Sequence, residues 1–395
     1  MTYASGLMPS TNRHRVSEAA KLPDSLEILE PLDRTAVKPY NWDIPITPVA
    51  VTRPVTTKQL SRVVQCASAS GVKVQARSGG HSYANYCLGG ESGALVIDMK
   101  NFQKFEMDTN NWFATFGSGT RLGDLTDRLY NHGARTIAHG TCPSVSHLTI
   151  GGLGPLSRQY GTALDHVEEV EVVLANGTIT RASNTHYPDL FFVRAPHRRS
   201  ESSPNSLFIR NPPRKMSSNI PIISSTTTTS LGEKPHLIPL IRTGNKSAFA
   251  STFATWQDIV KDPQLDRKLA TTFIIMELGM IISGTCCLDK ASDLDTDYMS
   301  LGTYFGTREE YDALQFEQRL GNNATVNVIQ LDNWLGTVTN WAENEALKLI
   351  GGISMAFTED SLIPADGIQN LFDYLETTPK GTPAWFVIFD LQAGK

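Results

Sequence analysis

We predict an α+β fold of two or three domains for this chain of 395 residues. Strand-like and amphipathic helical segments alternate through the first half of the sequence. From about residue 247, helical patterns surround apolar strand-like runs. No G-x-G-x-x-G sequence follows a predicted strand, so the doubly wound dinucleotide-binding fold is not indicated.

Composition sets limits on the class of protein. Hydrophobic residues make up 40% and charged residues 19%, values that are ordinary for a soluble globular protein. The net charge of −5 and the lack of a long basic run argue against nucleic acid as a partner. No apolar stretch of about 18 residues is present, so we expect no membrane span. The first residues lack the charged and apolar parts of a signal peptide, and localisation stays open.

The first half opens with a polar segment over residues 1–40, which contains several prolines and is predicted to be an N-terminal arm. A short strand is predicted over 48–51. Thr56 or Thr57 can cap a helix whose apolar residues share one face. Further elements are predicted at 72–75, 94–98, 112–116, 121–133 and 167–174, and Asn176-Gly177 indicates a hairpin turn before 178–180.

The second half contains helical patterns at 248–260 and 362–375. The sequence Thr307-Arg308-Glu309-Glu310 is a capping signature that predicts a helix start. Strand-like apolar runs cover 273–282 and 384–390, and we expect the latter to be a central strand.

A glycine turn follows the strand-like run at 72–76. It reads Arg77-Ser78-Gly79-Gly80-His81-Ser82-Tyr83. Paired glycines allow the backbone to approach a ligand closely and to present N–H groups to an anion. A histidine directly after such a turn would be held beside that ligand. The alternative is a tight turn with an ordinary surface histidine.

A second motif lies about sixty positions further on. It reads Gly140-Thr141-Cys142-Pro143-Ser144-Val145 and is followed by a glycine-containing stretch over 149–161. The two motifs resemble the RSGGHS and GxCxxV signatures of covalent-flavin oxidases of the berberine-bridge type. These oxidases belong to the vanillyl-alcohol-oxidase (PCMH) superfamily.

The resemblance implies a covalent flavoprotein. FAD would be joined through its 8α-methyl carbon to His81 and through ring carbon C6 to Cys142. The resemblance also implies a two-lobed PCMH-type FAD-binding domain over 41–193. The further cofactor-binding residues carried over from the motifs are Arg77, Ser78, Gly79, Gly80, Ser82, Ser144, Val145, Gly151 and Gly152.

Segments 331–338 and 385–391 resemble fungal glucooligosaccharide and chitooligosaccharide oxidases. This likeness implies an antiparallel, helix-covered substrate domain, here a partial one over 247–395. It also implies oxidation of the reducing-end C1 of an oligosaccharide to a lactone, with O2 reduced to H2O2. The expected partners are a small-molecule or oligosaccharide substrate and dioxygen, with the chain acting as a monomer. The resembled oxidases are mostly secreted.

Asp390 matches the carboxylate that activates a tyrosine base in the resembled oxidases, which makes it the candidate catalytic residue. The tyrosine itself would follow Lys395, so we expect this chain to lack its base. The alternative is that Asp390 is a solvated acid at the end of a strand.

Four departures from the family pattern predict a damaged or misassembled chain. The loop after Val145 lacks three residues, and His147 takes the place of the family's loop histidine. Segment 194–246 reads as frameshifted or intron-derived, with 200–206 in a shifted frame. Residues 286–303 read as an insertion, and the end at Gly394-Lys395 reads as a truncation. Genuine divergence is the alternative.

These departures predict irregular chain over 194–243, where a buried strand belongs. Neighbouring strands would then carry unpaired backbone groups, so we expect poor folding or little bound flavin. Two functional alternatives remain open. The alternatives to an oligosaccharide oxidase are an inactive flavin-binding remnant and a family oxidase that acts on a secondary metabolite.

Other candidate residues have structural interpretations. His132, His139 and His166 lack metal-ligand spacing with cysteine or carboxylate partners, so no metal site is expected. Trp334, Trp341 and Trp385 are expected to be core residues.

Overall fold

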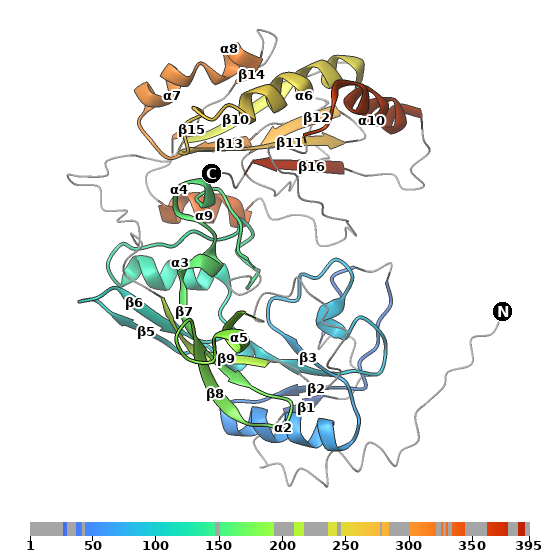
Figure 1. Cartoon of the computed structure of the whole chain (residues 1–395), viewed down its shortest axis with the longest axis vertical. Helices are drawn as coiled ribbons and strands as arrows, with labels where there is room; N and C mark the ends of the chain where they lie inside the picture. Colours follow the sequence, from blue (N-terminus) through green and yellow to red (C-terminus); the bar gives the residue numbers. More distant parts are fainter. Residues whose placement is uncertain are drawn as a thin grey trace, which may run out of the picture. The chain divides into compact units, whose positions relative to one another are not determined.

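A computed structural model describes most of the chain (Figure 1). The described residues are 27–29, 37–41, 44–146, 151–192, 209–216, 236–242, 246–276, 279–283, 301–320, 325–326, 329–330, 334–343, 362–377 and 386–391. The chain divides into two compact units. Unit 1 comprises Met1–Arg121, Val167–Ser218 and Lys348–Gly352, and unit 2 comprises Leu122–His166, Asn219–Leu347 and Ile353–Lys395. The domain boundaries predicted from the sequence stay a prediction.

Unit 1 contains a four-stranded sheet in the order β1-β2-β4-β3. Its strands are β1 (Glu27–Leu29), β2 (Ala50–Arg53), β4 (Leu95–Asp98) and β3 (Val74–Arg77). Strands β2 and β3 run parallel to β4, which is buried at every position. The predicted helix is α2 (Thr57–Ala69), and the Thr56 side chain accepts from the Gln59 N–H as its cap. Its apolar face packs against β4 because its apolar residues recur at helical spacing.

Two smaller sheets complete unit 1. Strands β5 (Phe105–Asp108) and β6 (Phe113–Phe116) form an antiparallel pair. Strands β8 (Ile179–Ser183), β7 (Val167–Val173) and β9 (Ile209–Met216) form a sheet in that order. The predicted Asn-Gly turn joins β7 to β8, and Gly177 adopts a φ of 81°. The remaining helical segments are η1 (Tyr86–Leu88), η2 (Met99–Asn101) and α5 (Pro188–Phe192).

The prediction that 194–246 is irregular is wrong for two of its stretches. Strand β9 pairs with β7, and β10 (His236–Arg242) pairs with four strands of unit 2. The register of β9 shifts between Glu169 and Glu171, where the paired residue changes from Lys215 to Asn211. Prolines lie between these two partners, and proline has no N–H to donate to a ladder.

Strand β7 therefore has a partner strand on each edge, in place of the missing neighbour that was expected. A sheet edge presents a row of unpaired backbone N–H and C=O groups, which can pair even with a strand that contains prolines and charged residues. Residues 200–206 and most of 286–303 lie outside the described residues, although 301–303 belong to β13. The frameshift, the insertion, the truncation and the expected poor folding stay predictions.

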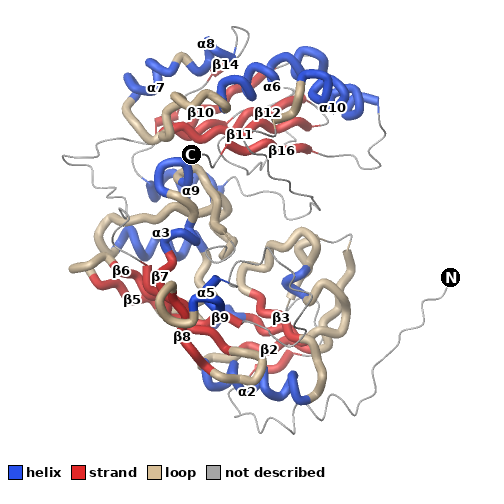
Figure 2. Tube along the Cα trace, in the orientation of Figure 1, coloured by secondary structure: helices blue, strands red, loops and turns tan. Residues whose placement is uncertain are grey.

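Unit 2 is built on a seven-stranded antiparallel sheet with the main order β12-β10-β13-β11-β16, and β14 and β15 pair with β10. Helices α6, α7, α8 and α10 lie over one face of it (Figure 2). The strands are β10, β11 (Leu269–Met276), β12 (Gly279–Ser283), β13 (Leu301–Tyr304), β14 (Thr325–Val326), β15 (Ile329–Gln330) and β16 (Phe386–Leu391). The covering helices are α6 (Lys246–Val260), α7 (Arg308–Leu314), α8 (Phe316–Leu320) and α10 (Ala365–Thr377).

Two strand predictions need correction in this sheet. The apolar run 273–282 is not one strand, because β11 and β12 pair antiparallel as a hairpin. Glu277 and Gly279 interrupt the run, and both residue types are depleted in strands. Strand β16 lies at the end of the strand order and pairs with β11, so it is not central among the described strands.

A further group of unit 2 elements comes from the first half of the sequence. These are α3 (Leu122–Asn131), α4 (Ser157–Tyr160) and η3 (Ala163–His166), with α9 (Trp334–Glu343) packed near α3. Trp334 is buried with Ala138, Leu156 and Val338, which confirms its predicted core role. The side chains of Trp341 and Trp385 lie outside the described residues.

Candidate functional site

The His81 loop begins where β3 ends at Arg77. Gly80 has a φ of 81°, a conformation that favours glycine, and a Cβ there would lie 2.5 Å from Arg77 Nη2. The Arg77 guanidinium therefore packs directly over the turn. The Ser78 hydroxyl donates to the Ser118 carbonyl at 2.7 Å, which ties the loop to the Gly117–Thr120 turn.

Two buried polar atoms of this loop region have no hydrogen-bond partner among the described residues. They are Arg77 Nε and Ser118 Oγ. Buried polar atoms normally have a hydrogen-bond partner, so these two unsatisfied atoms suggest a bound group that would supply one. A guanidinium and a hydroxyl suit an anionic, oxygen-rich group.

Cys87 lies beside the same turn, and its thiol donates to the Gly80 carbonyl at 3.5 Å. Burial raises the pKa of the Cys87 thiol, and the nearby Arg77 guanidinium only partly opposes this shift. The Cys87 thiol is therefore protonated at pH 7. A protonated thiol is a poor nucleophile.

The Cys142 loop is held by backbone contacts with the start of α3. The Val145 N–H donates to the Cys142 carbonyl at 3.2 Å and closes a turn. The Leu122 N–H donates to the Val145 carbonyl at 2.8 Å, and the Gly123 N–H donates to the Pro143 carbonyl at 2.9 Å. These helix N–H groups have no partner within the helix, so the loop satisfies them. Cys142 and Ser144 are half-buried, and Val145 is buried.

The Gly151-Gly152 turn lies in the same unit. Gly151 has a φ of 120°, and a Cβ there would meet no described atom within 4 Å. Gly152 has a φ of 74°, and a Cβ there would overlap the Ala163 side chain. The Leu164 N–H donates to the Gly151 carbonyl at 2.8 Å and fixes the turn against η3. Among the described residues, Gly151 therefore borders open space on an otherwise packed segment.

His139 precedes the Cys142 loop and is a structural residue. Its Nδ1 lies 2.7 Å from the Gly140 carbonyl, and its Nε2 lies 3.0 Å from the Thr126 hydroxyl on α3. Burial lowers the pKa of His139 to about 4, so the ring is neutral at pH 7. Nδ1 then donates to the carbonyl, and Nε2 accepts from the hydroxyl.

The other predicted histidines are also placed. His132 contacts the Arg128 carbonyl at 2.7 Å. His166 is buried, neither ring nitrogen has a hydrogen-bond partner among the described residues, and burial lowers its pKa. His147 lies outside the described residues. No group of three or more His, Cys, Asp or Glu side chains suited to a metal ion occurs in the described part of the chain.

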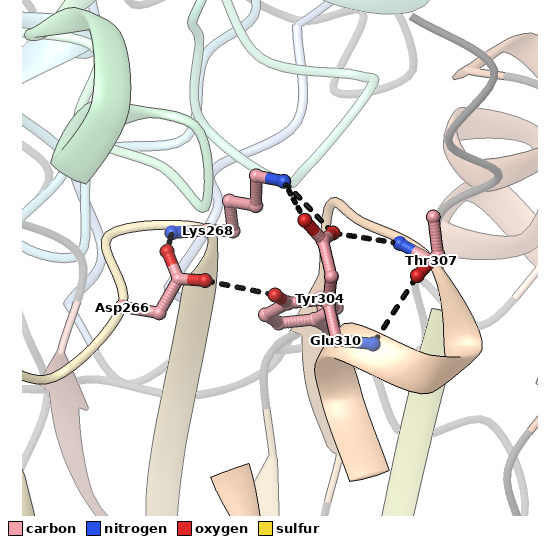
Figure 3. Close-up of polar contacts among 5 residues, drawn as sticks. All are labelled: Asp266, Lys268, Tyr304, Thr307 and Glu310. Atoms are coloured by element: carbon pink, nitrogen blue, oxygen red, sulfur yellow. Dashed lines mark hydrogen bonds and ion pairs between the residues drawn. The ribbon is translucent and has the colours of Figure 1, made fainter. Parts of the chain in front are cut away.

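The segment after Gly152 is fastened to the unit 2 sheet through Arg158 on α4. Its guanidinium donates to the carbonyls of Asp266 at 2.8 Å and Leu269 at 2.6 Å. Asp266 in turn accepts from the Tyr304 hydroxyl at 2.8 Å and from the Lys268 N–H at 2.9 Å (Figure 3). A buried cation that donates to carbonyls fixes the backbone on both sides.

Figure 3 also shows the start of α7. The Thr307 side chain accepts from the Glu310 N–H, and the Glu310 carboxylate accepts from the Thr307 N–H. This reciprocal pair confirms the predicted capping signature. Lys268 Nζ lies 2.8 Å from the same carboxylate.

The predicted site residues divide between the two units. Arg77, Ser78, Gly79, Gly80, His81 and Ser82 belong to unit 1, whereas Cys142, Ser144, Val145, Gly151, Gly152 and Asp390 belong to unit 2. Asp390 lies on β16 opposite Thr272 of β11. The structure describes the backbone of Asp390 but not its side chain. The functional role of each of these residues stays a prediction.

The residues of each unit suit one part of a covalently held FAD. The unsatisfied Arg77 and Ser118 atoms suit a pyrophosphate. The open space at Gly151 would admit a flat ring near the backbone. His81 and Cys142 supply the nucleophile types that a doubly attached flavin requires.

Comparison with known proteins first defines the class. Residues 48–183 match the FAD binding domain family. FAD-linked oxidoreductase sorD of Penicillium rubens is 34% identical over 372 residues, which cover 91% of this chain and 71% of sorD. Xylooligosaccharide oxidase of Thermothelomyces thermophilus is 41% identical over 163 residues, covering 40% of this chain and 33% of that protein.

The fold is also shared with a solved glucooligosaccharide oxidase from Acremonium strictum, whose 6-S-cysteinyl, 8α-N1-histidyl FAD has been studied. The TM-score is 0.72 at 20% identity, over 97% of this chain and 75% of that one. The chain belongs to the FAD-linked oxidoreductases. The predicted family, the α+β fold class and the classification as an FAD-linked oxidase are confirmed.

No helix in the described part of the chain is long and apolar enough to cross a membrane.

Proposed function

We propose that this chain oxidises the reducing-end C1 of an oligosaccharide to a lactone and reduces O2 to H2O2. Membership in the family makes it an FAD-dependent oxidoreductase. The observation that carries the proposal is the pair of locally fixed loops with His81 and Cys142. These are the residue types that the A. strictum glucooligosaccharide oxidase joins to its FAD.

FAD, when bound, supplies a hydride acceptor and a route for electrons to dioxygen. The residues of this chain would hold it in place. His81 and Cys142 would provide the two covalent attachments, and the Arg77 guanidinium would bind the pyrophosphate. The Gly151-Gly152 turn would lie beside the ring. Two attachments would hold the ring firmly and leave one face open for a long oligosaccharide.

Oxidation of a hydroxyl carbon also requires removal of the hydroxyl proton. We assign Asp390 a part in this proton transfer. Its backbone position on β16, paired to β11, supports a fixed location in the substrate domain. We further propose that the protein acts as a monomer and, like most of the resembled oxidases, is secreted.

A second candidate function is oxidation of a non-carbohydrate secondary metabolite. The relative that aligns over 91% of this chain is named only as an FAD-linked oxidoreductase, whereas the xylooligosaccharide oxidase aligns over 40%. Substrate choice depends on residues outside the cofactor-binding motifs, so the case for an oligosaccharide substrate rests on the shorter alignment.

Flavin fluorescence of the denatured chain on a gel tests the cofactor assignment. We expect the fluorescence to stay with the wild-type chain and with each of the variants His81→Ala and Cys142→Ser. The double variant should release its flavin. Complete release of flavin from the wild-type chain would contradict covalent attachment and would favour an inactive remnant that at most binds flavin.

An oxygen-electrode screen tests the substrate class. Cello-, malto- and chito-oligosaccharides are compared with non-sugar alcohols at equal concentration. Oxygen uptake with an oligosaccharide and formation of an equal amount of H2O2 would support the first candidate. Uptake confined to the non-sugar alcohols would support the second.

A further inference from the structure

Asn85 fastens Tyr40, Asn41 and Ile44, at and just after the end of the predicted N-terminal arm, to the His81 loop. Asn85 is fully buried. Its Oδ1 accepts from the backbone N–H groups of Tyr40 at 3.0 Å and Asn41 at 3.1 Å. Its Nδ2 donates to the carbonyls of Asn41 at 2.7 Å and Ile44 at 2.8 Å. These bonds use the full hydrogen-bonding capacity of the amide.

The clamp is reciprocal, because Asn41 also reaches across to the loop. Asn41 is buried, and its Nδ2 donates to the Tyr83 carbonyl at 2.9 Å. Asn85 adopts a φ of 52°, a left-handed conformation that asparagine tolerates better than most residues. The four hydrogen bonds of the Asn85 side chain therefore hold its backbone in this rarely populated conformation.

The clamp brings an aromatic ring against His81. The ring centroids of Tyr40 and His81 lie 4.9 Å apart with an interplanar angle of 38°. Tyr83 packs on Tyr40 at 5.6 Å. The imidazole follows directly after the Gly79-Gly80 turn. Contact with the Tyr40 ring therefore restricts the rotamers of His81.

We propose that Tyr40, held in place by Asn85, is a positioning residue that orients the His81 imidazole for attachment to the 8α-methyl carbon of FAD. This inference rests on the proposed function. Attachment removes one hydrogen from the methyl group and one from the imidazole nitrogen and forms the C–N bond. The two hydrogens leave as two protons and two electrons in total, and these pass to dioxygen, which becomes H2O2.

The test measures attachment through His81 alone, in full-length chains that carry Cys142→Ser. Each chain is incubated with excess FAD, and aliquots are denatured at intervals and examined for flavin fluorescence. Tyr40→Leu should slow attachment about two- to tenfold, the factor expected for a ring contact of this kind. Tyr40→Phe keeps the ring and should attach at the rate of its parent.

Two controls separate positioning from general damage. Tyr187→Leu removes another tyrosine–histidine contact of unit 1, the 4.3 Å pair with His186, and should leave the rate unchanged. In a His81→Ala background, where only Cys142 can attach, Tyr40→Leu should also have no effect. A structural defect would slow both attachments.

The outcomes distinguish this inference from the proposed function. No covalent flavin in the wild-type chain would overturn both. Covalent flavin in the wild-type chain, with equal rates for Tyr40→Leu and its Cys142→Ser parent, would overturn the inference alone. Equal slowing through His81 and through Cys142 would also overturn it, because Tyr40 would then have only a structural role.

Discussion

The two candidate attachment loops are held in different ways. The His81 loop is fixed mainly by side chains, namely the Asn85 amide, the Asn41 amide and the Ser78 hydroxyl. The Cys142 loop is fixed by backbone bonds to the first turn of α3 and by glycines packed against neighbouring backbone. The first arrangement depends on the identity of a few polar residues. The second depends on positions where no side chain fits.

This difference predicts how each loop responds to substitution. Removal of a buried polar side chain leaves its partners unsatisfied, and the cost grows with the number of bonds lost. Addition of a methyl group to a packed glycine forces two backbone segments apart. The Cys142 loop should therefore be sensitive to added volume, and the His81 loop to lost hydrogen bonds.

The largest effect is expected for Gly154→Ala. A Cβ at Gly154 would overlap the His139 carbonyl, so the segments on either side of the Cys142 loop would have to separate. We expect a loss of about 4 kcal/mol in the free energy of unfolding. Gly151→Ala is the matched control, since it meets open space and should cost only about 1–2 kcal/mol through its positive φ. Urea denaturation measures both, and equal losses would contradict the distinction.

Asn85→Ala should lower the free energy of unfolding by about 3 kcal/mol, because it leaves two N–H groups and two carbonyls without their buried partner. Asn101→Ala removes a single exposed bond to the Arg53 carbonyl and should cost about 0.5 kcal/mol or less. Thermal unfolding of both variants at one pH checks the contrast. Similar melting temperatures would show that the clamp is not stabilising.

His139, which precedes the Cys142 loop, should make the free energy of unfolding depend on pH. Burial lowers its pKa from 6.5 to about 4, so the folded chain binds fewer protons than the unfolded chain between these values. The stability from the neutral ring is present above about pH 6.5 and is lost as the pH falls toward 4. We expect a loss of about 2 kcal/mol between pH 7 and pH 5. The difference between wild type and His139→Gln in urea titrations measures it, and parallel pH profiles would refute it.

The smallest effect is expected for Ser78→Ala, which removes one bond to the Ser118 carbonyl. The loss should be about 1 kcal/mol, with the loop otherwise intact. Ser92→Ala, which removes an exposed bond from the Thr47 N–H, serves as its control. If Ser78→Ala cost as much as Asn85→Ala, the tie to Ser118 would be as important to the His81 loop as the clamp.

Much of the fold could be predicted from local patterns. Helix α2 and its Thr56 cap, the buried strand β4 and the capping box of α7 follow from periodicity and end signals, because each element satisfies its own local requirements. The pairing of β9 and the hairpin of β11 and β12 could not be predicted in this way. Strand pairing depends on which edges remain free, and that is a property of the assembled sheet.

The sequence by itself determined the family and predicted the chemistry. His81 and Cys142 stand in glycine-containing motifs whose residue types and order are recognisable without a structure. Only the tertiary structure decided what holds each loop. Asn85 and Tyr40 carry no local signal, since an asparagine and a tyrosine some forty positions apart are unremarkable until folding makes them neighbours. Local sequence patterns reflect interactions within one segment. The contacts of Asn85 and Tyr40 join segments far apart in the sequence, so they form only when the chain folds.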